Sequence, residues 1–264
     1  MISRKLLILL QFLYRDFYTF SRRIKTYAFN YMLIYPIAFS VAFGYFLPSG
    51  SFGNVTPEQA TIIFIGSMLV FLQVTGFVLN LELVRDLEGD KFINYQISIL
   101  DARLVVLERI VFVSLFSFIL VFPYFPLATL ILGPRFFIPN ASWPAVYLML
   151  LLGSFLCSAL NVWAFSFLKG GSRALPKFWL RIYNPMVVLG GFAVPWIVIN
   201  TFSKPLSYIL LANPLIYISE GLRQAFLDSE RFFSLPLCIG ALILFSCALC
   251  ASTMYYFKKK IDHI

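Results

Sequence analysis

Residues that could do acid–base or metal chemistry are few in this chain of 264 residues. His263 is the only histidine, so the sequence offers no histidine pair for a catalytic or metal site. No Gly-rich phosphate loop ending in Lys-Ser or Lys-Thr occurs. Four cysteines lie inside apolar runs, where we expect packing rather than a disulfide or zinc site: Cys157, Cys238, Cys247 and Cys250. We therefore expect no catalytic site, metal or cofactor in this chain.

The densest charge lies in the segment 82–101, which carries seven charged side chains in a chain that is 60% hydrophobic. Leu83, Val84 and Leu87 would give a short helix over 84–96 one apolar side. Such a helix would present a charged, glycine-containing surface for another protein, made of Arg85, Asp86, Glu88, Gly89, Asp90 and Lys91. The alternative is a solvated loop whose charges only keep it out of the bilayer. The segment alone leaves both interpretations open.

Composition predicts an integral membrane protein. Only 12% of the residues are charged and the mean hydropathy is +0.85, which leaves too little polar surface for a water-soluble globule. The net charge of +9 could indicate nucleic-acid binding. However, the basic residues flank apolar runs instead of forming a patch with interleaved aromatics, so we expect membrane lipids, and no nucleic acid, as their partners.

Residues 1–25 have the spacing of an amphipathic helix that lies in the cytoplasmic membrane interface. The polar face carries Arg4, Arg15 and Arg22 beside Gln11. The apolar face would consist of Leu6, Leu9, Leu10, Leu13, Phe17, Phe20 and Ile24. A signal peptide is the competing interpretation, but charges at 15 and 16 follow a short apolar core and no small-residue cleavage site appears.

A helix needs about 20 apolar residues to cross a hydrocarbon core of roughly 30 Å. Runs that satisfy this requirement predict six membrane-spanning helices over 27–47, 61–81, 110–132, 143–168, 180–199 and 232–257. Seventeen of the 21 Lys and Arg residues then fall on the side that holds both termini. Because basic residues concentrate in cytoplasmic loops, we expect both termini in the cytoplasm, with the protein in a bacterial cytoplasmic membrane.

The segment 200–231 is too long for a turn, and its apolar pieces are too short to span, so we expect a re-entrant helical hairpin. A seventh span is the alternative, but it would place the three lysines at 258–260 outside. No Asp, Glu, Lys or Arg occupies the middle of a predicted span, which argues against ion-coupled transport and implies an external energy source. The polar span residues Gln73, Asn80 and Asn161 favour hydrogen bonds between helices.

This layout resembles the permease subunit of type-2 ABC exporters over essentially the whole chain. Residues 85–91, Arg-Asp-Leu-Glu-Gly-Asp-Lys, are similar to the family's coupling segment, and 190–195, Gly-Gly-Phe-Ala-Val-Pro, to the break that ends its fifth span. Residues 212–226 resemble the Asn-Pro-(Leu or Ile)-x-Tyr-x-x-x-x-x-Arg pattern of its hairpin, matched here by Asn213, Pro214, Tyr217 and Arg223, with Glu220 one turn before the arginine. The chain departs from the family at 96–99, where many relatives have a Thr-Pro pair.

The resemblance implies that two copies of this chain form the pathway and that two separate ATPase subunits, which bind ATP and Mg, hold its cytoplasmic loops. From the residues themselves, Asn213 can cap a helix and Glu220 can pair with Arg223 on one helix face. Capping and pairing alone are the structural alternative to substrate contact at these positions.

Aromatic residues make up 18% of the chain and recur at helical spacing along 27–47, which suggests Tyr31 and Tyr35 as contacts for an amphiphile. The expected substrate is a lipid-linked glycan, a glycolipid or another amphiphile. A multidrug exporter is the first alternative, and a membrane scaffold or receptor without a motor is the second. The alternative for the rings themselves is packing between helices or against lipid.

Overall fold

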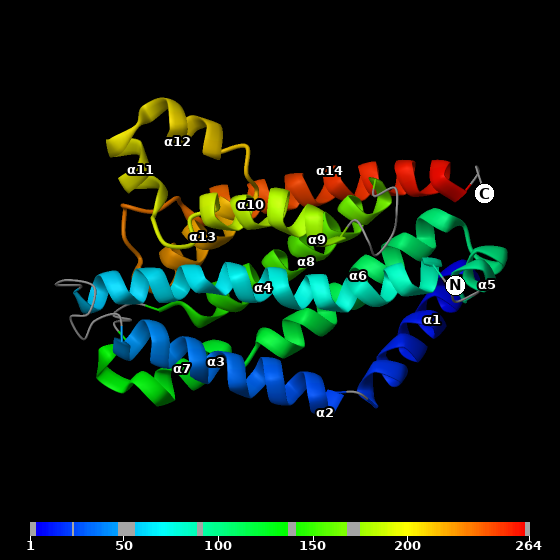
Figure 1. The fold of residues 1–264 in the computed structure, drawn as a ribbon, viewed down its shortest axis with the longest axis horizontal. Helices are drawn as coiled ribbons and strands as arrows, with labels where there is room; N and C mark the ends of the chain where they lie inside the picture. Colours follow the sequence, from blue (N-terminus) through cyan, green and yellow to red (C-terminus); the bar gives the residue numbers. More distant parts are fainter. Residues whose placement is uncertain are drawn as a thin grey trace.

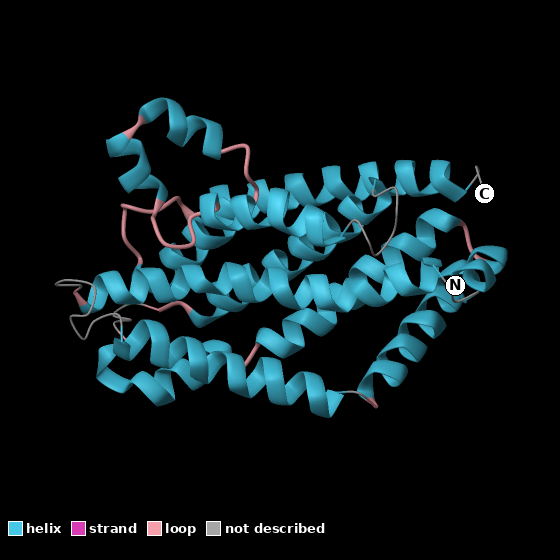
Figure 2. Cartoon of the chain, viewed as in Figure 1, coloured by secondary structure: helices cyan, strands magenta, loops and turns pink. Residues whose placement is uncertain are grey.

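The computed structural model describes residues 4–22, 24–46, 56–88, 92–136, 141–167 and 175–261. Within these ranges the chain is helical throughout, with short connecting loops and no strand (Figure 2). The predicted all-α class is confirmed.

Five helices are long and apolar enough to cross a membrane among the described residues, which confirms the predicted membrane character. The first is built from α2 (Ile24–Tyr27), η1 (Ala28–Ile34), α3 (Tyr35–Phe39) and η2 (Ser40–Phe46), in which η1 and η2 are π-helical. The others are α4 (Pro57–Glu88), α6 (Ala102–Val121) with α7 (Tyr124–Leu132), α8 (Trp143–Phe167) and α14 (Leu235–Ile261). A short helix, η3 (Gly133–Arg135), follows α7.

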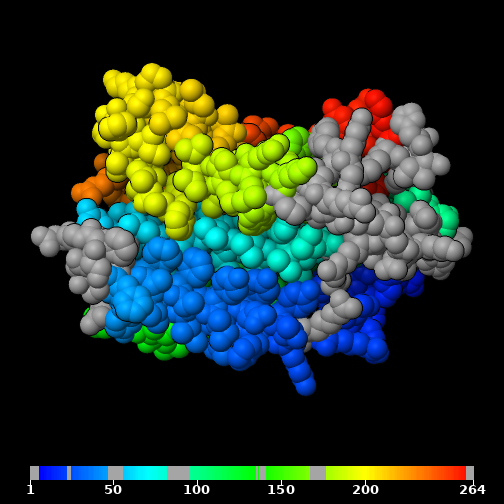
Figure 3. Space-filling model, viewed as in Figure 1, coloured from blue at the N-terminus to red at the C-terminus, as the bar shows by residue number. Residues whose placement is uncertain are grey.

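Helix α8 lies at the centre of the bundle, packed against α4, α6, α13 (Leu215–Leu227) and α14. Figure 3 shows the first spanning helix, in blue, lying along α4, in cyan, with the segment before α11 on the other side of α4. Both termini lie at one end of the bundle together with α1 and α5, whereas α7, α11 and α12 lie toward the other end (Figure 1).

The predicted N-terminal helix is present as α1 (Arg4–Ser21), and its second half holds it to the bundle. The rings of Phe17 and Phe20 pack on Phe112 of α6, with centroid distances of 5.1 and 4.9 Å. Leu6 and Leu10, which the periodicity placed on the same apolar face, are instead about half exposed. An exposed apolar half is what a helix lying against a membrane interface would present.

The segment predicted as the fifth span, 180–199, is not one continuous helix in the structure. The chain forms α9 (Leu175–Phe178), η5 (Trp179–Tyr183) and α10 (Asn184–Leu189), then leaves the helix and resumes as α11 (Trp196–Phe202). Gly191 adopts a left-handed φ of +85°, which glycine tolerates best, and Pro195 has no amide hydrogen for a helix.

Two other predicted elements have different boundaries in the structure. The helix expected over 84–96 is divided: α4 continues to Glu88, α5 covers Phe92–Ile99, and residues 89–91 lie outside the described residues. The region expected as a hairpin over 200–231 contains the end of α11, α12 (Lys204–Leu210) and α13. Helix α13 is buried in the bundle, whereas α11 and α12 project from it and expose Phe202 and Ile209 (Figure 1).

Candidate functional site

The break after α10 frees backbone carbonyls that a continuous helix would have paired, and α13 supplies their donors. Ser219 donates its hydroxyl to the carbonyl oxygen of Gly190 at 2.8 Å. Arg223 donates from Nη2 to the carbonyl of Gly191 and, at 3.1 Å, to that of Phe192. Two segments that the sequence singled out separately, 190–195 and 212–226, therefore form one contact.

Glu220 completes this contact on the far side of the break. Its Oε1 accepts the backbone N–H of Trp196, the first residue of α11, at 3.0 Å, and lies 3.1 Å from Nη1 of Arg223. Neither charged side chain is more than 1% exposed. We call Ser219, Glu220 and Arg223, with the backbone of 190–196, the Arg223 network. It fixes both ends of the broken segment to α13.

The start of α13 is fixed by the Asn-Pro pair of the same motif. Asn213 accepts the backbone N–H of Leu215 through Oδ1 at 3.1 Å, as expected for a helix cap, and donates Nδ2 to the carbonyl of Met186 at 2.7 Å. The Tyr217 hydroxyl donates to the carbonyl of Leu211 at 3.0 Å. Asn213 and Tyr217 therefore join α13 to α10 and to the end of α12.

Helix α4 is the third element of the Arg223 network. Nε of Arg223 donates to the carbonyl of Ile62 at 3.2 Å, so all three guanidinium nitrogens donate a hydrogen bond. A Cβ added at Gly66 would lie 1.9 Å from the carbonyl oxygen of Phe192 and 2.5 Å from Nη2 of Arg223. Glycine at 66 therefore permits α4 to approach the break, and the sequence analysis did not identify it.

A buried charged pair inside a membrane bundle is stable only when its hydrogen bonds are satisfied, because desolvation of the charges is costly. The Arg223 network meets this condition for the guanidinium. It therefore holds α4, α13 and the broken segment in one arrangement, and a second arrangement would have to exchange several hydrogen bonds at once.

A second buried charged cluster joins α1 to the opposite end of the bundle. Asp16 is 3% exposed, and its Oδ2 lies 2.9 Å from Nη1 of Arg109 on α6. Arg15 also pairs with Asp16 through Nε at 2.9 Å. Glu108 is 1% exposed, and neither of its carboxylate oxygens has a hydrogen-bond partner within the described residues. The side of α1 that faces the bundle therefore carries charge as well as apolar side chains.

The sequence analysis missed this cluster, although a signal for it was present. Asp16 lies three residues after Leu13 and four before Phe20, so it shares the helix face that packs on α6. Among the residues predicted for this helix, Arg22 is exposed with its guanidinium 5.0 Å above the ring centroid of Tyr18. The side chain of Arg4 lies outside the described residues.

The aromatic residues of the first span form a ladder along one face. Tyr31 and Tyr35 stack with centroids 5.3 Å apart, and both rings approach Phe71 of α4, at 6.1 and 5.8 Å. The ladder ends at Phe43, whose ring lies 6.0 Å from that of Phe192 in the break. Both tyrosines are only partly exposed, so in this conformation they pack the first span against α4.

The predicted coupling residues lie in a part of the chain that the structure describes only partly. The backbone of Arg85, Asp86 and Glu88 is the last turn of α4, but their side chains lie outside the described residues. Gly89, Asp90 and Lys91 lie outside them entirely. The segment is bounded by the ends of α4 and α5, at the end of the bundle that also holds the termini (Figure 1).

Comparison with known proteins identifies no family: no family model, curated protein or solved structure matches the chain.

Proposed function

We propose that this chain is the membrane-spanning subunit of an ATP-driven exporter of the type-2 ABC class, which works as a dimer with two separate ATPase subunits. The observation that carries the proposal is the Arg223 network. Two of the sequence segments that resemble this family meet there around one buried ion pair. A chance resemblance in two segments gives no reason for them to form a shared buried contact.

Helix α4 supplies a physical route from an ATPase to this network. It runs without interruption from Pro57 to Glu88, so the charged coupling segment is at one end of the helix and Ile62, which accepts from Arg223, is near the other. These positions are about 39 Å apart at the rise of an α-helix. A partner that holds the segment differently in its two nucleotide states would bias the position of α4, and with it the Arg223 network.

The substrate class belongs to the same proposal. We assign an amphiphile, a lipid-linked glycan or glycolipid in the first place, because stacked aromatic faces suit sugar rings and acyl chains. Since Tyr31 and Tyr35 stack on each other and approach Phe71, they would reach a substrate only when the first span separates from α4. A small apolar drug is the alternative cargo.

The test is isolation of the chain from its native membrane in a mild detergent, followed by mass spectrometry of the complex. The proposal predicts a second protein with a phosphate-binding loop in equal molar amount, and ATP hydrolysis that lipid-linked glycans accelerate. A membrane scaffold would purify without an ATPase and would show no dependence on ATP. Hydrolysis that only small apolar drugs stimulate would replace the glycan assignment with a drug.

A further inference from the structure

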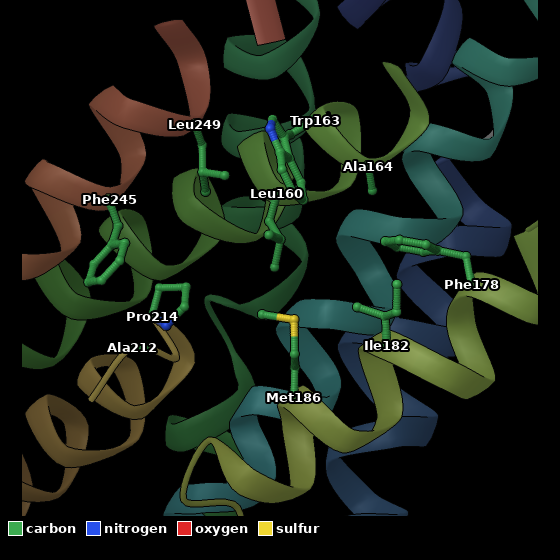
Figure 4. A pocket seen from close by; sticks show the side chains of 10 residues that line it. All are labelled: Leu160, Trp163, Ala164, Phe178, Ile182, Met186, Ala212, Pro214, Phe245 and Leu249. Carbon is green, nitrogen blue, oxygen red and sulfur yellow. The ribbon is translucent and has the colours of Figure 1, made fainter. Parts of the chain in front are cut away.

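A groove of about 540 Å³ lies between α8, the helical segment 175–189, α14 and the residues Ala212 and Pro214 before α13 (Figure 4). Trp163 of α8 and Phe245 of α14 form part of one wall, and Phe178, Ile182 and Met186 follow one another along the other. The lining side chains are almost entirely apolar, and the volume is within the usual range for ligand sites in proteins.

The groove opens toward the surface of the bundle. Ile182 lines it and is 44% exposed, and Leu244, next to the lining residue Phe245, is 69% exposed. Because α8 and α14 meet the length and composition of membrane-spanning helices, we expect lipid chains around this opening. An acyl chain in such an apolar groove makes favourable dispersion contacts, whereas water would find no hydrogen-bond partners there.

Two basic residues lie on the helical segment that forms one wall of the groove. Lys177 directly precedes Phe178 and Arg181 directly precedes Ile182, so both are one position from a lining residue, and both are exposed. Within the described residues, neither has an ion-pair or hydrogen-bond partner. Basic residues between membrane helices on the cytoplasmic side are typical binding groups for anionic lipid head groups.

We propose that this groove is a binding site for one anionic phospholipid, with an acyl chain between α8, the segment 175–189 and α14 and its phosphate at Lys177 and Arg181. The charges select the head group, and the apolar wall holds the chain. The site does not depend on the proposed export function, since any protein with this surface would bind the lipid. An occupied groove would also fix the distance between α14 and the helix that carries the break.

The test places the photoreactive residue p-benzoylphenylalanine at position 182 in the full chain, in nanodiscs of equal parts phosphatidylglycerol and phosphatidylcholine. Position 188 is the matched control, because Val188 is on the same helical segment, is 64% exposed and does not line the groove. Each basic residue near the surface favours anionic lipid by roughly fivefold. We therefore expect adducts at 182 to be enriched in phosphatidylglycerol at least about fivefold over those at 188.

The variant Lys177→Gln/Arg181→Gln should lower the enrichment at 182 to the value at 188, while Lys204→Gln, which changes an exposed lysine on α12, should leave it unchanged. If the protein retains Lys177 and Arg181 and the adducts at 182 and 188 show equal lipid ratios, the proposal is overturned. This outcome does not depend on whether the double variant folds. A protein–protein adduct at 182 would also overturn it, since a second copy of the chain would then cover the groove.

Discussion

Arg223 on α13 donates a hydrogen bond to the backbone carbonyl of Ile62 on α4, with 3.2 Å between Nε and the oxygen. The acceptor belongs to the same helix whose last turn holds the first of the charged residues proposed to couple to an ATPase. Since α4 is continuous between these points, a shift of its charged end along the helix axis would act on the Arg223 network. This hydrogen bond is the physical link on which the proposed function depends.

The first prediction concerns the space between α4 and the break. Gly66→Ala should destabilise the protein by about 1–3 kcal/mol, because the added methyl group would meet the carbonyl of Phe192, a backbone atom that cannot move aside freely. Gly240→Ala on α14 is the matched control: nothing lies within 4 Å of its added Cβ, and alanine favours a helix interior by about 1 kcal/mol. Unfolding in mixed micelles measures both. Equal stability of the two variants would contradict the close approach of α4.

The second prediction separates the carbonyl contacts of Arg223 from its ion pair. Arg223→Met should cost about 3–5 kcal/mol of unfolding free energy, because it leaves Glu220 charged and the carbonyls of the break without donors. Glu220→Gln keeps an acceptor for Trp196 and should cost less, about 1–3 kcal/mol. The same unfolding assay compares the two variants. If Glu220→Gln proves the more damaging, charge pairing and not the carbonyl network holds the break.

Lysine should not replace the arginine in this network. Arg223→Lys keeps the positive charge but loses the planar group that reaches Glu220, Gly191 and Ile62 at once. Full stability of this variant would show that a single point charge is sufficient at this position.

The third prediction concerns the attachment of α1. A double-mutant cycle on Asp16→Ala and Arg109→Ala should give a coupling energy well above 1 kcal/mol, because both side chains are nearly fully buried. The exposed pair Glu58 and Arg231, 3.3 Å apart, provides the matched control and should couple by about 0–1 kcal/mol. Indistinguishable coupling energies would mean that the aromatic contacts of α1, and not its charge, attach it to α6.

The difference between prediction and structure follows from what periodicity can detect. Apolar runs predicted the membrane character because that depends on composition and length, and spacing predicted that Glu220 and Arg223 would share a helix face. The backbone groups that accept from Arg223 could not be predicted, since they are the carbonyls of Gly191, Phe192 and Ile62, which carry no side-chain signature. Gly66 was missed for the same reason, because its importance lies in what approaches it.

The fifth span shows a limit of hydropathy. Residues 180–199 are apolar enough for a span, but the Gly-Gly pair and Pro195 interrupt the helix, and hydropathy does not register backbone conformation. Asp16 shows a different limit: its place on an apolar helix face was visible in the sequence but was not interpreted, and only the fold identified Arg109 as its buried partner.

The fourth prediction concerns orientation. In a background without the native cysteines, Arg22→Cys should react with an impermeant thiol reagent only from the cytoplasmic side, and Thr56→Cys only from the outside. Both positions are exposed, and they lie on either side of the first spanning helix, so labelling should not disturb packing. The basic residues near the termini set the expected direction. Labelling of both positions from one side would refute the single crossing between them.

The central claim is that ATP-driven movement enters this chain through its charged coupling segment, and the most direct measurement is the ratio of transport to ATP hydrolysis in proteoliposomes. Reversing Glu88 and Asp90 to lysine should lower this ratio strongly while insertion and folding stay normal, because charge reversal across an interface costs affinity and register. Glu230→Lys, an exposed reversal beyond α13, should leave the ratio unchanged. A coupling ratio in the Glu88→Lys/Asp90→Lys variant equal to that of the unmodified protein would contradict the account.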